Sequence, residues 1–139
     1  MKTFNVMVDI DASAQRVFRA LSDVEKWPDW TPTVQSVRRL DSGPFTVGSR
    51  ARIVQPKIRP AVWQVSVMDA DANFTWVSKS PGLRLEAGHT VQPAGAGCRV
   101  SLTFEITGAL SSIAGLIFGR TIAEYVTTEA QALKKHCES

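Results

Sequence analysis

Hydrophobic residues recur at helical spacing throughout residues 108–137. They follow one another at intervals of three or four positions, which places most of them on one side of a helix. They are Leu110, Ile113, Ala114, Ile117, Phe118, Ile122, Tyr125, Val126 and Leu133. No proline interrupts the stretch, and Lys134, Lys135 and His136 supply positive charge where a helix C-terminus favours it. At about 1.5 Å per residue the predicted helix is about 40 Å long, so it runs the length of the molecule.

Two glycines interrupt the side chains of this helix. Gly115 and Gly119 lie four residues apart and therefore share a face in the first half of the stretch. The spacing predicts either that another backbone approaches this face or that the helix bends there.

Upstream of this helix the pattern changes to alternation of apolar and polar residues, which is typical of half-buried strands. Alternating stretches and turn signals predict strands at residues 3–10, 34–40, 48–55, 61–68, 74–79, 83–92 and 98–106. Pro56 and Pro60 are expected to bracket a loop, and Trp63, Val65 and Val67 to share one face.

A short helical region is expected between the first two strands. Ser13 is suited to cap a helix that presents Val17, Phe18 and Leu21. Residues 23–32 contain two tryptophans and two prolines, which predicts a helical corner. The order predicts an α+β fold, with one domain over residues 1–139. An antiparallel meander of about six to seven strands has one face covered by the long helix.

Composition excludes several classes of protein. The chain is 44% hydrophobic and 21% charged, with a net charge of +3 whose basic residues are dispersed, so we expect no nucleic-acid partner. No apolar run approaches the roughly 18 residues of a membrane span, and the first residues lack the core of a signal peptide. We expect a cytoplasmic protein in which Cys98 and Cys137 are reduced thiols. Phosphate-loop, nucleophile-elbow and zinc motifs are absent from the sequence, so no metal or cofactor is predicted.

The order of elements resembles the START-like, or Bet v 1-like (SRPBCC), superfamily, and in particular its bacterial polyketide cyclase/dehydrase-like members. The resemblance covers the whole chain. It rests on residues 10–18 at the first helix, residues 23–32 with their tryptophans, residues 88–91 before a glycine-rich turn, and the closing helix. It implies a helix-grip fold, in which a curved sheet wraps around the C-terminal helix, and a cavity for an apolar ligand between them.

His89 is the candidate for acid/base chemistry. It shares a strand face with Leu85, Ala87 and Val91, so it is expected to point into the space between sheet and helix. There it would either transfer a proton or serve as a core histidine that is hydrogen-bonded to the backbone or to a helix residue. Glu124 and Tyr125 are possible partners, but they point about 100° apart on a helix. Tyr125 lies nearer the apolar side and is preferred.

Aromatic and polar residues on the inward faces would line a ligand pocket or fill a core. The ligand-binding candidates are Gln55, Trp63, Phe74, Trp76, His89, Phe104, Ile117 and Tyr125. Trp27 and Trp30 would close one end of the cavity or anchor the short helices to the sheet.

These residues support three hypotheses. The first is a protein that binds a lipid, isoprenoid, polyketide or aromatic molecule, with His89 and Tyr125 at its polar end. The second is a cyclase or dehydratase that uses His89 as the general acid/base. The third is an interaction module with a packed core, and any of them could form a homodimer.

Overall fold

Seven antiparallel strands form a single sheet in the computed structural model, which describes residues 2–139. The strands are β1 (Lys2–Ile10), β2 (Ser36–Arg39), β3 (Arg50–Gln55), β4 (Ile58–Asp69), β5 (Asn73–Ser80), β6 (Leu83–Ala94) and β7 (Gly97–Thr107). Their order in the sheet is β1-β7-β6-β5-β4-β3-β2, with every pairing antiparallel. The predicted meander is confirmed, and the first strand joins it beside the last.

Two short helices follow β1, and one long helix ends the chain. Helix α1 (Ala14–Ser22) begins at Ser13, whose side chain accepts a hydrogen bond from the backbone N–H of Arg16 at 3.1 Å. The 3₁₀ helix η1 (Val24–Asp29) forms the expected corner. Helix α2 (Ser111–Glu138) has 28 residues, and none of the helices within residues 2–139 has the length and apolarity to cross a bilayer.

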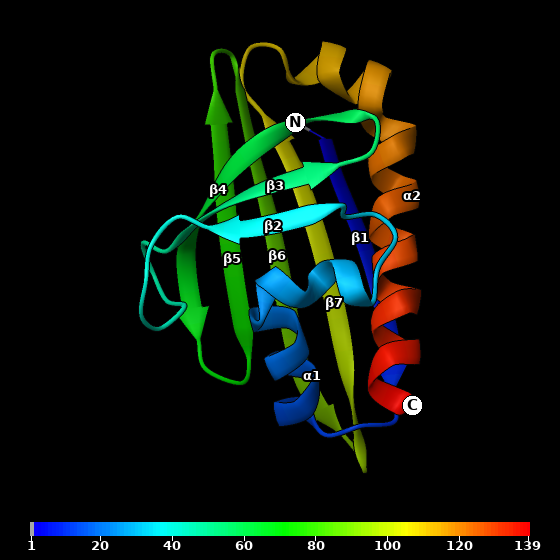
Figure 1. Ribbon diagram of the computed structural model, residues 1–139. Coiled ribbons are helices and arrows are strands. Elements are labelled where there is room, and N and C mark those ends of the chain that lie inside the picture. The colour runs from blue at the N-terminus through cyan, green and yellow to red at the C-terminus, as the bar shows by residue number, and fades with distance from the viewer. Residues whose placement is uncertain (1) are drawn as a thin grey trace.

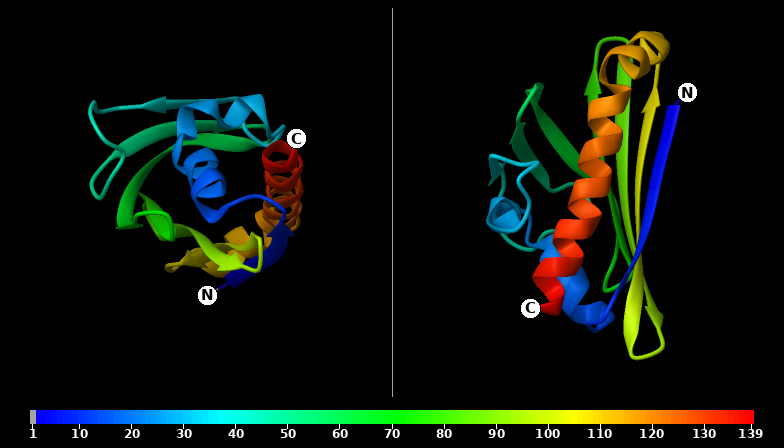
Figure 2. Two further views of the ribbon diagram at one scale, coloured as in Figure 1. Left: turned by 90° about the horizontal axis from the view of Figure 1, so that it is seen from below. Right: turned by 90° about the vertical axis from the view of Figure 1, so that its right-hand side faces the viewer.

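The sheet curls into an open trough, and α2 closes its open side (Figures 1 and 2). Seen end-on in Figure 2, α1 lies inside the curve. Beta-bulges between Ile53 and Gln55 and between Val65 and Val67 interrupt the regular pairing. Such bulges bend a strand and increase its twist, so they help the sheet to curl around the helix. The expected helix-grip fold is confirmed.

Two expectations about β4 were wrong. Val67 was expected to share the buried face of Trp63 and Val65, but it is exposed, because the extra residue of the bulge reverses the alternation beyond Val65. Pro60 was expected to end a loop, yet it lies within β4, where the pairing with β5 has not yet begun. A proline is tolerated there because no partner on that side requires its missing N–H.

The first part of α2 differs from the rest of the helix. Gly119 lies against the ring of Phe4, and Gly115 lies against the side chain of Lys2, so side chains of β1 approach the glycine face rather than a backbone. In Figure 1 the first turns of α2 lie at an angle to the remainder, which agrees with the predicted bend. Beyond these turns the buried residues are Ile122, Val126, Ala130, Leu133 and Cys137. Cys137 and Cys98 are both free and buried.

We expect Leu133→Ala to lower the free energy of unfolding by about 2–5 kcal/mol. Leu133 is completely buried in the core, and its truncation would leave a cavity beneath α2. Urea denaturation followed by tryptophan fluorescence measures the change. Leu116→Ala is the matched control, because Leu116 is 87% exposed and should change stability by less than about 0.5 kcal/mol. Equal effects in the two variants would contradict this assignment of the core face.

Candidate functional site

A cavity of about 570 Å³ lies between the sheet and α2. This volume is within the range of small-molecule binding sites, about 300–1,000 Å³. Its walls come from β3, β4, β5, β6, β7, η1 and α2. The lining includes Trp27, Ile53, Gln55, Trp63, Trp76, Ala87, His89, Phe104, Phe118, Ile122, Tyr125 and Glu129. The cavity lies between sheet and helix, as the family resemblance implied, and its lining is mainly apolar and aromatic.

One end of the cavity is closed and the other is open. Trp27, Trp76 and His89 line it and are all buried. The exposed lining residues, Arg59, Lys79 and Phe118 among them, lie at the β3–β4 and β5–β6 turns and on the first half of α2. These turns and the start of α2 therefore form the mouth of the cavity.

Aromatic rings pack tightly at the closed end. The ring centroids of Trp27 and Trp76 are 5.3 Å apart in an edge-to-face arrangement, a favoured geometry for aromatic pairs. Trp27 also donates its indole N–H to the carbonyl of Leu21 at 3.0 Å, which ties η1 to α1. Trp27 thus both closes the cavity and anchors the corner. Trp30 stacks on His136 near the end of α2 and is not among the residues that line the cavity.

His89 lies in the wall of the cavity, as predicted, and its ring stacks on Phe74 with centroids 4.1 Å apart. Its Nδ1 is 3.1 Å from the carbonyl oxygen of Phe74. A carbonyl only accepts, so Nδ1 carries the proton of the neutral ring and Nε2 is left as an acceptor. Burial lowers the pKa of His89 to about 4, partly offset by the bond to Phe74. His89 is therefore neutral at pH 7 and cannot serve there as a general acid.

Tyr125 and Glu124, the residues proposed as partners of His89, interact with other residues instead. The Tyr125 hydroxyl donates to the carbonyl of Pro56 at the β3–β4 turn, so the expectation that it reaches His89 is wrong. Tyr125 still lines the cavity, but its hydroxyl holds the turn against α2. Glu124 is exposed and lies 3.7 Å from Arg120 on the outer face of the helix.

Two of the eight predicted ligand-binding residues do not line the cavity. Phe74 is fully buried but lies behind the wall, because its ring packs against Phe18, Trp27 and His89. Ile117 is 63% exposed, because it lies on the outer face of α2, whereas Ala114 and Ile122 in the same part of the helix are buried. Gln55, Trp63, Trp76, His89, Phe104 and Tyr125 do line the cavity.

Glu129 is a charged cavity residue that the sequence pattern did not single out. It lies one turn after Tyr125, and its Oε1 accepts a hydrogen bond from the Thr33 hydroxyl at 2.9 Å. Thr33 in turn bonds to Thr31, and Gln55 donates to the Thr33 carbonyl. Burial raises the pKa of Glu129 to about 7, with the Thr33 bond acting in the opposite direction. The available signal was its i+4 spacing from Tyr125, which places a carboxyl on the cavity side of the helix.

The profile of the polyketide cyclase/dehydrase and lipid transport family matches residues 1–138. The chain belongs to this family. Among curated proteins, none matches the sequence.

Similar solved structures share the fold at low identity. The ZhuI aromatase/cyclase from Streptomyces sp. R1128 is 15% identical with a TM-score of 0.79, over 99% of this chain and 93% of that one. A START superfamily protein from Mycobacterium smegmatis is 17% identical with a TM-score of 0.75, over 98% and 97%. Ara h 8.0201 is 12% identical with a TM-score of 0.77, also over 98% and 97%. These likenesses show that this polyketide cyclase/dehydrase family member shares its fold with the three proteins.

Proposed function

We propose that this family member binds a hydrophobic small molecule that carries one polar group. The observation that supports this most strongly is the cavity, whose volume of about 570 Å³ accommodates such a molecule. Burial of apolar ligand surface contributes about 25 cal/mol per Å² before the costs of binding. The family description, which includes lipid transport, agrees with such a ligand.

Glu129 and His89 would recognise the polar group. Glu129 Oε2 has no hydrogen-bond partner in residues 2–139, and neither has His89 Nε2. The neutral His89 accepts a hydrogen bond, and Glu129 donates one when it is protonated. A hydroxyl can satisfy both side chains, because it is both donor and acceptor. We therefore propose that the ligand is a lipid, isoprenoid, polyketide or aromatic molecule with a hydroxyl or carbonyl group.

We expect freshly purified protein to release an apolar compound on denaturation. Native mass spectrometry would detect the added mass, and a solvent extract would supply the compound for identification. The neutral fluorophore N-phenylnaphthylamine provides a direct binding test, because Trp27, Trp63 and Trp76 in the wall can transfer energy to it. An apo mass together with no fluorescence enhancement would contradict the proposal.

A second function is favoured by the presence of two titratable groups in one cavity. In the dehydration of a β-hydroxy ketone, a base removes the proton from the carbon beside the carbonyl. The same group, now protonated, gives this proton to the departing hydroxyl, the C–O bond breaks, and a C=C bond and water form. Glu129 is better matched to this work at neutral pH than His89, because its pKa is about 7. We therefore propose Glu129 as the general acid/base, in place of His89, which the sequence suggested for this role.

We expect Glu129→Gln to abolish any dehydration while N-phenylnaphthylamine binding is retained within about threefold. The amide keeps the size of the side chain and the acceptor for Thr33, but it cannot transfer the proton. Absorbance of the conjugated enone formed from an aryl β-hydroxy ketone would report the reaction. No enone with the wild-type protein would count against catalysis on this substrate class and leave the binding function standing.

A further inference from the structure

We propose that the mouth of the cavity docks on an anionic lipid surface. The docking surface is the outer face of the protein around the mouth, so docking is a property additional to the binding of a ligand inside the cavity. Exposed apolar residues and an excess of positive charge coincide there, and the proposal stands on that coincidence.

An apolar patch covers the first part of α2. Ile113, Leu116 and Ile117 are 57%, 87% and 63% exposed, and the neighbouring Leu110 and Phe118 are also exposed. They fall within nine consecutive residues, so this is a contiguous patch rather than scattered surface residues. Contiguous exposed apolar residues on a helix are characteristic of protein-binding or membrane-binding surfaces.

Direct contacts hold this patch at the mouth of the cavity. The N–H of Leu110 donates to the carbonyl of Gly82 in the β5–β6 turn at 2.8 Å. Further along α2, Tyr125 bonds to Pro56 in the β3–β4 turn, and Phe118 itself lines the cavity. A surface that receives the apolar patch therefore also covers the opening.

The charge around the mouth distinguishes a membrane from other occupants. The surrounding segments, residues 2–4, 56–62, 78–86 and 104–124, contain six basic and three acidic residues. Two of the acids are paired, Glu86 with Arg84 at 3.3 Å and Glu124 with Arg120 at 3.7 Å. No ion pair within residues 2–139 involves Lys2, Lys57, Arg59 or Lys79.

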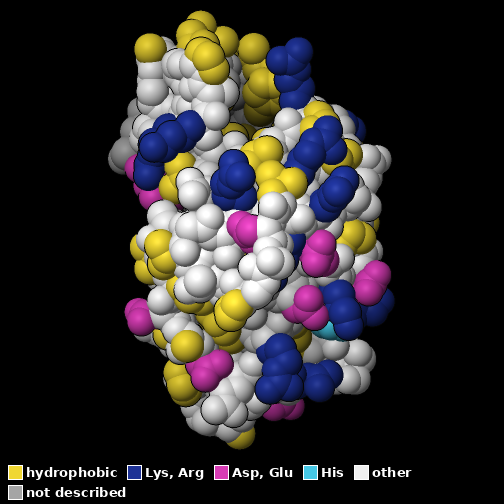
Figure 3. Space-filling model, turned by 60° about the vertical axis from the view of Figure 1, so that its left-hand side comes forward, with side chains coloured by type: hydrophobic (Ala, Val, Ile, Leu, Met, Phe, Trp, Pro, Cys, Tyr) yellow, Lys and Arg dark blue, Asp and Glu magenta, His cyan; other side chains and the backbone are white. Residues whose placement is uncertain are grey.

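The net charge of these segments is +3, which equals the net charge of the whole chain. Basic and acidic residues in the rest of the chain are therefore equal in number. In Figure 3 the upper third of the visible face shows Lys, Arg and apolar side chains around a hollow, whereas the lower half mixes both signs. Apolar residues with unpaired cations match the acyl chains and anionic headgroups of a bilayer surface. A second copy of this chain would instead bring the same positive charge against itself.

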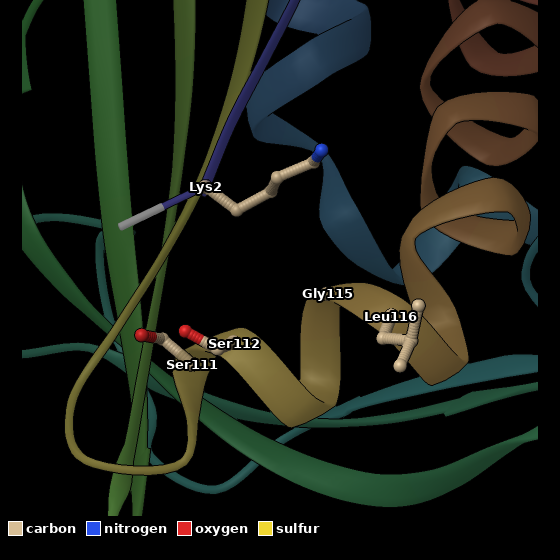
Figure 4. Close-up of a pocket in the computed structure, with 5 residues that line it drawn as sticks. All are labelled: Lys2, Ser111, Ser112, Gly115 and Leu116. Atoms are coloured by element: carbon tan, nitrogen blue, oxygen red, sulfur yellow. The ribbon is translucent and has the colours of Figure 1, made fainter.

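A small pocket of about 330 Å³ adjoins the apolar patch (Figure 4). Lys2 from β1 lines one side, and Ser111, Ser112, Gly115 and Leu116 from the start of α2 line the other. An ammonium group and serine hydroxyls are suitable donors for the oxygens of a lipid phosphate. The pocket therefore places donors beside the residues that would enter the acyl region.

Flotation of the full chain with lipid vesicles tests the proposal. We expect binding to vesicles of phosphatidylcholine with phosphatidylglycerol, weak binding to phosphatidylcholine alone, and release by high salt, which screens the attraction. The combined variant Ile113→Ser, Leu116→Ser and Ile117→Ser should bind at least about tenfold more weakly. Lys2→Gln combined with Lys57→Gln should lose about thirtyfold in vesicle binding, because each of the two basic residues near an anionic surface contributes about 1 kcal/mol.

Matched controls use similar residues away from the mouth. Met7→Ser with Val47→Ser replaces two exposed apolar residues, and Lys26→Gln with Lys135→Gln removes two distant charges. Both control variants should keep vesicle binding. Every variant should also keep N-phenylnaphthylamine binding, because none of the substitutions should disturb the fold or the cavity. Vesicle binding that survives the triple serine variant would overturn the docking proposal, as would an absence of vesicle binding by the wild type. A dimer in analytical ultracentrifugation that the triple variant abolishes, without vesicle binding, would also overturn it.

Discussion

Ala87→Phe is expected to weaken N-phenylnaphthylamine binding by more than about tenfold, which corresponds to at least about 1.4 kcal/mol. Ala87 lines the cavity beside His89, and its cross-strand partners are Trp76 and Phe104, which also line it. A phenyl ring added here would occupy the space that the ligand needs. The loss arises from excluded volume, and fluorescence titration measures it directly.

Ala70→Phe is the control for this prediction. Ala70 is exposed in the turn between β4 and β5, so the same ring is added outside the cavity. The affinity of Ala70→Phe for N-phenylnaphthylamine should match that of the wild type. Thermal unfolding should confirm that both variants are folded. If Ala87→Phe binds as tightly as Ala70→Phe, the fluorophore occupies some other surface and the cavity is not the binding site.

The second large effect concerns pH, because the two titratable groups of the cavity act in opposite directions. The pKa of Glu129 is raised from 4.5 to about 7, so the folded state binds the extra proton and stability falls as pH rises through this interval. The pKa of His89 is lowered from 6.5 to about 4, so the unfolded state binds the extra proton and stability rises with pH from 4 to 6.5. Between pH 4.5 and 6.5 the two contributions oppose each other.

Single substitutions should therefore uncover opposite pH profiles. In Glu129→Gln only the histidine remains, so the free energy of unfolding should increase from pH 4.5 to 6.5 relative to wild type. In His89→Gln the free energy of unfolding should decrease over the same pH interval relative to wild type. Each change has an upper bound of about 3 kcal/mol, at about 1.36 kcal/mol per pKa unit. Above pH 7, Glu129→Gln should be more stable than wild type, because no buried carboxylate has to ionise.

Urea denaturation at several pH values measures these profiles. The double variant Glu129→Gln with His89→Gln serves as the control, because it removes both groups and should restore a pH dependence close to that of the wild type between pH 4.5 and 6.5. Parallel profiles for the two single variants would show that the groups are not buried as the structure places them.

The fold was largely readable from the sequence, because its signals are local. Alternation in residues 98–106 and the turns around them specify strands regardless of the rest of the chain. Ser13 signals a helix start through a hydrogen bond to a residue only three positions away. Of the two expectations about β4 that failed, the burial of Val67 depended on the bulge between Val65 and Val67. A single extra residue there reverses the alternation, and the sequence pattern carries no mark of it.

The site was only partly readable from the sequence. The apolar pattern identifies side chains that face the interior, but it does not tell which of them line a cavity and which are packed in the core. The inward faces of the strands identified Trp63, Trp76, His89 and Phe104, all of which line the cavity. Phe74 lies on the same inward face, but the tertiary packing of Phe18 and Trp27 covers it. The apolar periodicity grouped Ile117 with the buried face of the helix, whereas it lies on the exposed face and Ala114 and Ile122 are the buried residues of that part.

The sequence by itself determined the elements, their order, the covered face of the sheet and the presence of a histidine on that face. These follow from side-chain periodicity and turn chemistry, which act over a few residues. Only the tertiary structure decided that Glu129, rather than His89, has a pKa near neutral pH. Burial lowers the pKa of His89 and raises that of Glu129 because both side chains leave water, and the depth of that burial depends on residues far apart in the chain.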